Sequence, residues 1–289
     1  MFAPAHLRTF SAVCETGSFE LAAARVHVTP SAVSQRMRAL SETAGGPLFE
    51  RLQPARPTAL GRRILRHASD LAALEAQLAA DLSQGSGLRP VSVAINADSL
   101  ETWAIDALAA AEGYRFDVVI DDQDHSVELL RRGEVSAAVA ATALPVPGCD
   151  AVPLGTLRYR ATCSPAFAER WFPAGATAES LAVAPALQFD AKDALQARWM
   201  EMVAGRALHP PTHRIAATAP FAQATRAGLG WGLNPEALVM DDLAAGRLVE
   251  PAPGRALDTP LHWHMGRAMA RTLAPLTRAV REAARAALR

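Results

Sequence analysis

The stretch of sequence that decides the fold runs from Gly17 to Gly61 and reads GSFELAAARVHVTPSAVSQRMRALSETAGGPLFERLQPARPTALG. Ser18 is a favourable N-cap residue, because its hydroxyl can accept a hydrogen bond from a free N–H group in the first turn of a helix. Thr29 followed by Pro30 is a second start signal, since proline at the first helical position has no N–H group to leave unsatisfied. The stretch therefore predicts a short helix, a tight turn and a longer helix.

The longer helix, expected over residues 30–42, has two different faces. Val33, Met37 and Leu40 recur at i, i+4 and i+7 and should pack on neighbouring helices. Polar and basic side chains that can bond base edges and phosphates, with almost no acid, form the other face: Ser31, Ser34, Gln35 and Arg38, with Arg36 at its margin. Taken alone, this pattern also fits an ordinary amphipathic surface helix.

A further helix is expected upstream, over residues 4–16. Its apolar positions recur at helical spacing, and Gly17 after it is a typical C-terminal stop. Two short helices, a tight turn and a third helix with a polar, basic face together predict a helix-turn-helix that binds double-stranded DNA.

Downstream, residues 58–83 predict a long alanine-rich helix. Ile64, Leu71 and Leu78 recur every seven residues, and a narrow apolar seam of this kind packs against another helix. The seam could face a second copy of the chain or residues of its own chain. Residues 84–87, of sequence QGSG, then predict a flexible hinge.

Charge is distributed unevenly although the formal net charge is zero. Residues 1–67 carry nine arginines and four acids, a balance of +5, so the remaining residues sum to −5. A basic N-terminal part on an acidic body indicates DNA binding at one end of the chain only. The three cysteines are too scattered for a disulfide framework, and no apolar run reaches membrane-spanning length, so we expect a cytoplasmic protein with no membrane partner.

The body of the chain alternates strands and helices, which predicts an α/β fold with parallel sheet covered by helices. Strands are expected at 91–95, 116–120, 137–141, 186–189, 214–217 and 261–264. Helices are expected at 99–111, 127–132, 194–203, 221–227 and at the C-terminal end. Ligands in such folds bind at the carboxyl ends of the strands, beside helix N-termini.

Acids gather at two of these strand ends, around residues 96–103 and 121–126. Residues 98–128 contain nine acids and one base, Arg115. For Glu112 and Asp117 a solvated surface role is preferred. For the strand-end acids, binding of a cationic ligand and helix capping at a solvated face both stay open.

Residues 17–61 closely resemble the signature of LysR-type transcriptional regulators, from the Gly-Ser-Phe start through Ser-Ala-Val-Ser-Gln-Arg to Leu-Phe-x-Arg and Thr-x-x-Gly. The resemblance implies a winged helix-turn-helix over residues 1–61 in which Arg51 and Arg56, on a wing at 48–57, lie along DNA phosphates. It also implies a linker and dimerisation helix with hinge at 62–88, and a two-lobed, periplasmic-binding-protein-like effector domain at 89–289. Lobe I would span about 89–162 and 261–289, and lobe II about 163–260, with crossings near Cys163 and Pro260.

A narrower resemblance, to the lysine-export and arginine regulator branch (LysG/ArgP-like), rests on residues 95–103, 121–125, 145–149 and 228–232. It implies L-lysine or L-arginine as effector and control of a basic-amino-acid exporter gene. Asp98 would bind the effector's ammonium, and Ser99 and Thr102 its carboxylate. Asp122 and Asp124 would bind the distal cation. Trp103 would form a wall of the cleft, and Thr218 and Phe221 would close it from the second lobe. Residues 262–267 depart from the branch, which leaves detail near the second crossing open.

Other sequence patterns give weaker indications of function. Gly228, Gly230 and Gly232 lack the strand-to-helix context of a nucleotide loop and indicate tight packing instead. His262 and His264 alone do not predict a metal site, and no nucleophile–base arrangement indicates an enzyme; no cofactor is expected. We expect a homodimer that can pair into a homotetramer. The alternatives are a LysR-type regulator with an unrelated metabolite effector and, in another class, a two-lobed solute-binding protein without DNA function.

Overall fold

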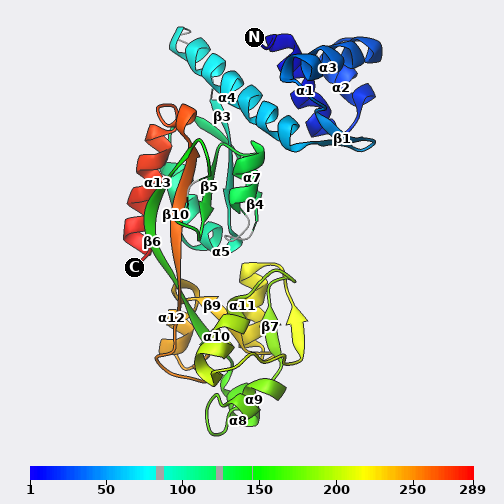
Figure 1. The fold of residues 1–289 in the computed structure, drawn as a ribbon. Coiled ribbons are helices and arrows are strands. Elements are labelled where there is room, and N and C mark those ends of the chain that lie inside the picture. The colour runs from blue at the N-terminus through cyan, green and yellow to red at the C-terminus, as the bar shows by residue number, and fades with distance from the viewer. Residues whose placement is uncertain (83–87, 122–125, 145) are drawn as a thin grey trace.

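The computed structural model describes residues 1–82, 88–121, 126–144 and 146–289. Three bodies follow one another along the chain: an N-terminal helical domain, a long helix, and two α/β lobes (Figure 1). The hinge expected at 84–87, and Asp122 and Asp124, lie outside the described residues. No helix within the described ranges is long and apolar enough to cross a membrane.

The N-terminal domain is built from α1 (Pro4–Thr16), α2 (Phe19–Arg25), α3 (Pro30–Ala44) and a hairpin of β1 (Phe49–Leu52) and β2 (Ala55–Pro57). The expected stop and start signals of the helices are confirmed. Gly17 ends α1 with φ of 68°, and the Ser18 hydroxyl accepts hydrogen bonds from the first-turn N–H groups of α2. The Thr29 hydroxyl caps α3 by accepting from the N–H of Ala32 at 3.2 Å. The apolar side chains of α1 and α3 close one core, in which Phe10, Val33 and Leu40 are fully buried.

Helix α4 (Ala59–Leu82) starts inside this domain and projects beyond it (Figure 1). The first part of its apolar seam packs on its own chain, because Ile64 is buried in the N-terminal core and Leu71 packs partly buried against it. The opposite side of α4 contacts lobe I. There the Arg66 guanidinium donates to the carbonyl of Pro147, at 2.8 Å, and to that of Leu130 in α7 (Ser126–Arg132).

Lobe I contains β3 (Arg89–Ile95), the continuous helical run α5 (Ala97–Ser99), η1 (Leu100–Ala104) and α6 (Ile105–Ala110), then β4 (Tyr114–Ile120), α7 (Ser126–Arg132) and β5 (Ala137–Ala140). Its sheet has the strand order β4-β3-β5-β10-β6-β9. Strand β3 is parallel to β4 and β5, as expected, but the other pairings are antiparallel. The expectation of a parallel sheet is therefore wrong for three of its five pairings: the sheet is mixed, because the strands that connect the lobes run opposite to β5 or to each other.

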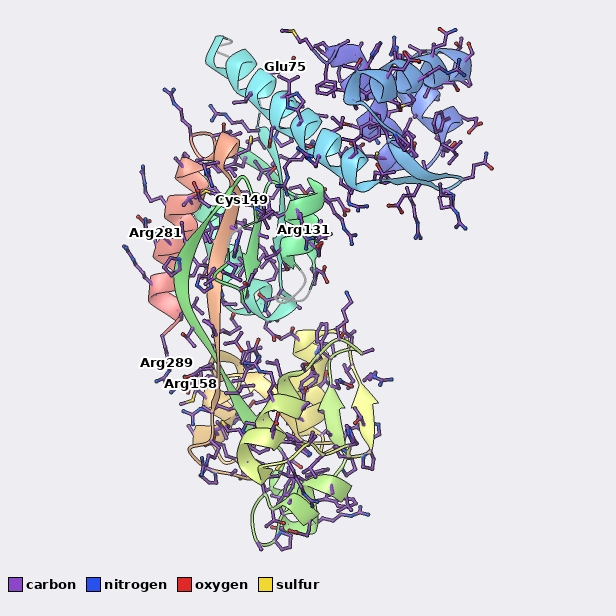
Figure 2. The ribbon with its side chains drawn as sticks, in the orientation of Figure 1. Glu75, Arg131, Cys149, Arg158, Arg281 and Arg289 are labelled. Atoms are coloured by element: carbon purple, nitrogen blue, oxygen red, sulfur yellow. The ribbon has the colours of Figure 1, made fainter. Side chains whose placement is uncertain are left out.

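These connecting strands are β6 (Cys149–Thr162) and β10 (Leu257–Gly266), which pair antiparallel along most of their length. Residues Tyr159–Thr162 of β6 already pair with β9 (Gly232–Pro235) in lobe II. After β10, the chain passes through η2 (Arg267–Met269) and ends in α13 (Ala274–Ala287), which packs on α6 and β6. Figure 2 shows Arg158 and Arg289 at the passage between the lobes, where Arg158 pairs with Asp258 and Arg289 with Glu236.

Lobe II consists of α8 (Pro165–Trp171), α9 (Ala178–Val183), β7 (Ala186–Gln188), α10 (Leu195–Ala204), β8 (Thr212–Arg214), α11 (Thr218–Arg226), β9 and α12 (Glu236–Ala244). Strand β8 ends where the sequence predicted a strand over 214–217 to begin, and α11 begins three residues before the expected 221. The glycines of 228–232 pack tightly, as expected. A Cβ on Gly232 would lie 2.6 Å from the Phe221 ring.

Candidate functional site

The exposed face of α3 carries the side chains that the sequence assigned to DNA. Ser31, Ser34, Gln35 and Arg38 are all exposed, while Met37 and its apolar neighbours turn inward. Arg36 is placed differently: it is half-buried and donates to the Thr9 hydroxyl at 2.9 Å. This bond ties α3 to α1, so Arg36 contributes to the packing of the two helices, and its phosphate contact stays a prediction.

The β1–β2 hairpin forms the expected wing beside this face. Arg51 and Arg56 are both exposed and stand directly opposite each other in the strand register. Like charges placed opposite on neighbouring strands destabilise a hairpin. A polyanion lying along the wing would offset this repulsion, and a phosphate backbone is such a partner. A cavity of about 550 Å³ between the wing tip at Leu52 and Gln53 and the start of α3 shows that the two elements border one groove.

A second candidate site lies between the two lobes. It is a cavity of about 250 Å³ at the carboxyl ends of β3 and β4, closed from the other side by lobe II. Its lining residues with polar or charged side chains are Asn96, Asp98, Asp121, Asp190, Lys192, Asp193, Gln196, Thr218 and Asn234. This is the position at which open α/β sheets bind ligands.

Asp98 is the centre of this cleft, because its carboxylate joins the lobes. One oxygen accepts a hydrogen bond from the Tyr159 hydroxyl on β6, and the other accepts one from the Thr218 hydroxyl on α11, both at 2.8 Å. The two hydroxyls are neutral donors. They orient the carboxylate at the point where the two lobes meet.

Three buried amides in the cleft have side-chain atoms without a hydrogen-bond partner within the described part of the chain. Both polar atoms of Asn96 are in this state, as are Oε1 of Gln196 and Oδ1 of Asn234, and all three residues are at most 5% exposed. A buried polar atom without a partner costs about 1–3 kcal/mol, so such groups need an explanation. A polar ligand in the cleft supplies one. The sequence offered only one signal for them: Asn96 stands at the N-cap of α5 and yet makes no capping bond there.

The structure brings some of the expected effector residues to the cleft and not others. Thr218 and Phe221 line it with Asp98. Ser99 and Thr102 do not: Ser99 is fully buried, and the Thr102 hydroxyl donates to the backbone carbonyl of Asp98 at 2.6 Å. The reason is geometric, since the helix that begins at Ala97 turns both side chains away from the strand end within one turn.

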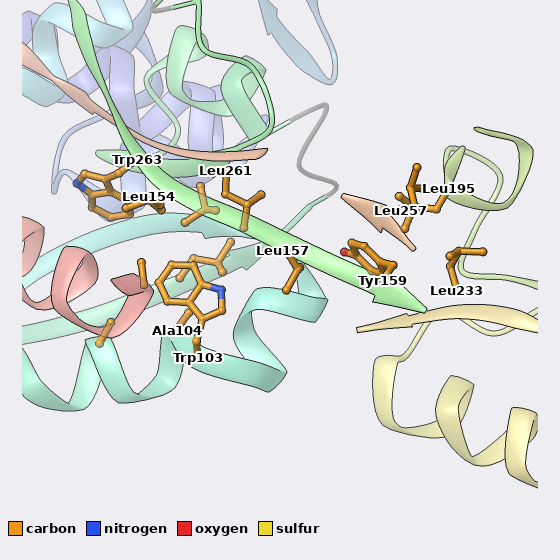
Figure 3. Close-up of a cluster of buried hydrophobic side chains, with 14 of the residues drawn as sticks. Trp103, Ala104, Leu154, Leu157, Tyr159, Leu195, Leu233, Leu257, Leu261 and Trp263 are labelled. Atoms are coloured by element: carbon orange, nitrogen blue, oxygen red, sulfur yellow. The ribbon is translucent and has the colours of Figure 1, made fainter. Parts of the chain in front are cut away.

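Trp103 also lies away from the cleft. Its side chain is 2% exposed and packs in the core of lobe I with Leu154, Leu157 and Trp263 (Figure 3). The expectation that it forms a wall of the cleft is therefore corrected: the tryptophan fills the space between the sheet and its covering helices. The apolar lining of the cleft comes instead from Ile120, Phe189 and Leu233, with Phe221.

Other chemistry finds little support within the described residues. They contain no group of His, Cys, Asp and Glu that could hold a metal ion. Burial raises the pKa of the Cys163 thiol to about 12, so it is not a reactive thiolate. The Nε2–H group of His264 donates to the Thr142 carbonyl at 2.8 Å, and burial lowers the pKa of this histidine.

A winged helix-turn-helix on a long helix, followed by two lobes around a polar cleft, defines the architecture of LysR-type transcriptional regulators. Residues 4–62 match the family of bacterial regulatory helix-turn-helix proteins of the lysR type, and residues 91–289 match the LysR substrate binding domain. The chain belongs to the LysR family and is a DNA-binding transcriptional regulator.

Its relatives include regulators named for basic amino acids. It is 38% identical over 295 residues to the lysine export transcriptional regulatory protein LysG of Corynebacterium glutamicum, covering 99% of each chain. The crystal structure of ArgP from Mycobacterium tuberculosis superimposes with a TM-score of 0.93 at 39% identity, over 100% of this chain and 99% of that one. Full-length LysG from C. glutamicum with bound effector arginine gives a TM-score of 0.82 at 37% identity, over 99% of each chain.

Proposed function

We propose that this regulator senses a basic amino acid, L-lysine or L-arginine, in the cleft between its lobes and controls a gene for export of basic amino acids. The observation that carries the proposal is the cleft itself, which combines carboxylates from both lobes with buried amides that have polar atoms without a hydrogen-bond partner among the described residues. The similarity to an arginine-bound LysG and to a lysine-export regulator supports the same effector class.

The cleft offers a complementary group for each end of an amino acid. The α-ammonium would bind the Asp98 carboxylate, which the Tyr159 and Thr218 hydroxyls already orient. The carboxylate would bind the free N–H groups at the start of α11, where Ala217 supplies no side-chain cap. The distal cation would lie against the acids that follow β4, among them Asp121. Asp122 and Asp124 remain the sequence's candidates for this role.

We further propose that residues 1–61, 62–88 and 89–289 act as DNA-binding, linking and sensing units of a homodimer that can pair into a homotetramer. The dimer would read a partly palindromic operator, with Ser31, Ser34, Gln35 and Arg38 at bases. Arg36, Arg51 and Arg56 would contact phosphates. Such a protein acts in the cytoplasm, where the chromosome lies, and catalyses no reaction.

Calorimetry on the full chain tests the effector. Arginine or lysine should bind, whereas norleucine, which keeps the chain length of lysine without the distal cation, should not. Asp98→Asn should weaken binding by about 2–5 kcal/mol, because it removes the buried charge that faces the ammonium. Asp124→Asn should have an effect of the same size if Asp124 is the partner of the distal cation.

Glu112→Gln is the matched control, since Glu112 is an exposed acid of the same lobe outside the cleft lining. It removes one negative charge and should leave the affinity for arginine within about twofold, the range expected for a distant, screened charge. Equal binding of norleucine and lysine would show that the cleft does not select a cation, and an effector of another class would then replace the amino acid in this proposal.

A further inference from the structure

The cleft contains a cationic side chain of its own, Lys192, whose identity is unusual in this chain. It is the only lysine among the 289 residues of the sequence, in which Lys and Arg together number 29. Lysine differs from arginine in carrying a compact charge with three rotatable donors on a flexible stem, so it forms no fixed bidentate pair and exchanges partners more readily.

The backbone at Lys192 is held firmly while its side chain is not. The Asp190 carboxylate accepts from the N–H groups of Lys192, at 2.7 Å, and of Asp193, at 3.0 Å. Asp193 in turn accepts from the N–H groups of Phe189 and Leu195, both at 2.9 Å. These bonds fix the loop between β7 and α10 at the edge of the cleft. The Lys192 side chain extends from this loop and is 52% exposed.

From there Lys192 reaches across to the other lobe. Its Nζ lies 3.3 Å from Oδ1 of Asp121, which follows the carboxyl end of β4. The two residues line the same cavity, together with three further carboxylates, of Asp98, Asp190 and Asp193. An ammonium thus already lies where carboxylates of both lobes face each other.

We propose that Lys192 is a built-in competitor of the effector: its ammonium holds Asp121 across the cleft until the distal cation of a basic amino acid displaces it. This inference rests on the proposed function, because it presupposes a cationic effector. The exchange replaces one cation at Asp121 by another, so it leaves that carboxylate paired before and after binding. A half-exposed ion pair is weak, which makes it releasable at moderate effector concentrations.

Two consequences follow. First, Lys192 lowers the affinity for cationic effectors, both by occupying Asp121 and by repelling a second cation in the cleft. Second, the Lys192–Asp121 ion pair connects the two lobes in the absence of effector. Effector binding therefore replaces this contact between the lobes by a contact through the effector. The side chain therefore sets the concentration at which the regulator responds.

Calorimetry with matched variants tests the first consequence. Lys192→Met, which keeps an apolar stem of similar length, should bind arginine about two- to fivefold more tightly, the range expected on removing one exposed ion pair. Lys192→Arg, which keeps the charge and can pair with Asp121 through two hydrogen bonds, should bind arginine no more tightly than the parent. The affinity for citrulline, which lacks the distal cation, should be the same in all three proteins. In an Asp121→Asn background, Lys192→Met should give a smaller gain, because only the repulsion between the two cations is then removed.

Because the chain has one lysine, reductive methylation with ¹³C-formaldehyde gives a single lysine signal, distinct from that of the N-terminal amine, on the full-length protein. This signal should shift in Asp121→Asn relative to the parent before any effector is added. It should narrow on addition of arginine, as the released side chain becomes more mobile. The measurement reports the Lys192–Asp121 contact independently of effector affinity.

The outcomes separate the two proposals. If the parent binds neither arginine nor lysine, the proposed function fails, and the inference fails with it. If the parent binds arginine but Lys192→Met binds it equally or more weakly, the inference alone is overturned. A weaker affinity of Lys192→Met for every amino acid, but not for cadaverine, would show that Lys192 binds the effector's carboxylate instead.

Discussion

Arginines of the N-terminal domain differ in what holds them, and this separates their roles in DNA binding. Arg38 is exposed on α3 next to the polar side chains of the same face, whereas Arg56 stands opposite Arg51 on the wing. A side chain inside the major groove can read a base, while one on the wing meets only phosphates. Arg36 is bonded to Thr9 and has the least freedom to reach DNA.

Substitutions at these residues should therefore differ in their effect on specificity. Arg38→Ala or Gln35→Ala should cost about 1–3 kcal/mol on operator DNA and much less on scrambled DNA. Arg56→Ala should weaken both equally and reduce the slope of log K against log salt by about one unit. Titrations of both DNAs at several salt concentrations measure this. Equal losses on the two DNAs for Arg38 and Gln35 would mean that another face of α3 enters the groove.

At this scale the sequence predicts what depends on neighbours in the chain. The caps at Ser18 and Thr29 and the inward face of α3 are confirmed, because capping and helical periodicity are local. Trp103 was misplaced, because a tryptophan near a strand end fits a cleft wall and a core equally well until tertiary packing is known. Asn96 was not selected, because only the structure shows that its side chain has no hydrogen-bond partner among the described residues.

Among the elements, α4 is the one through which we expect the proposed homodimer to form. Its buried side chains, such as Ile64, belong to the N-terminal core, so they are not available to a partner. Leu74, by contrast, is 44% exposed on the same helix, one turn beyond Leu71. Glu75 beside it marks the part of α4 that extends away from the body (Figure 2). This projecting part is where a second α4 would pack.

Leu74→Glu should therefore yield monomers and abolish operator binding, since one half-site alone binds weakly, while the thermal midpoint of the isolated subunit stays nearly unchanged. Leu71→Asp should instead destabilise the N-terminal domain by about 2–4 kcal/mol, because Leu71 packs against its core. Light scattering and thermal unfolding distinguish the two variants. An intact dimer for Leu74→Glu would show that the subunits meet elsewhere.

The sequence predicts short, periodic elements better than long ones that join domains. Most helices and β3, β4 and β5 fall within a few residues of expectation. Strand β6 was not expected, although it is the longest strand, because it passes between two lobes and its burial changes along its length. The mixed sheet follows from the same strand, and no local pattern encodes the direction in which a connecting strand returns.

On the scale of the whole molecule, we expect the proposed effector to change DNA binding through the junction between α4 and lobe I. Arg66 is the main polar contact of this junction, since its guanidinium donates to the carbonyls of Leu130 and Pro147. Ser69 adds a bond to the Gly133 carbonyl at 3.3 Å, and a Cβ on Gly133 would lie 2.9 Å from the Arg66 Cα. The helix and the lobe are therefore closely packed at this junction.

Removing this contact should uncouple the two sites without damaging either. In the parent, the effector should change operator affinity by about 1–3 kcal/mol, the usual range of coupling between two sites. In Arg66→Ala this difference should fall close to zero, while arginine affinity and effector-free operator affinity change by less than about threefold, since Arg66 lies in neither site. Operator titrations with and without arginine measure the coupling, and calorimetry checks the cleft.

Arg63→Ala is the matched control for this variant. Arg63 is exposed on the same helix, so its loss removes the same charge near DNA without touching lobe I. It should lower operator affinity equally with and without arginine and so preserve the coupling. A full arginine response in Arg66→Ala would show that the signal passes around α4, for example through a rearrangement between the subunits that needs no contact within one chain. Loss of the response in Arg66→Ala but not in Arg63→Ala would place the transmission at this junction, because the two variants differ only in which surface of α4 they change.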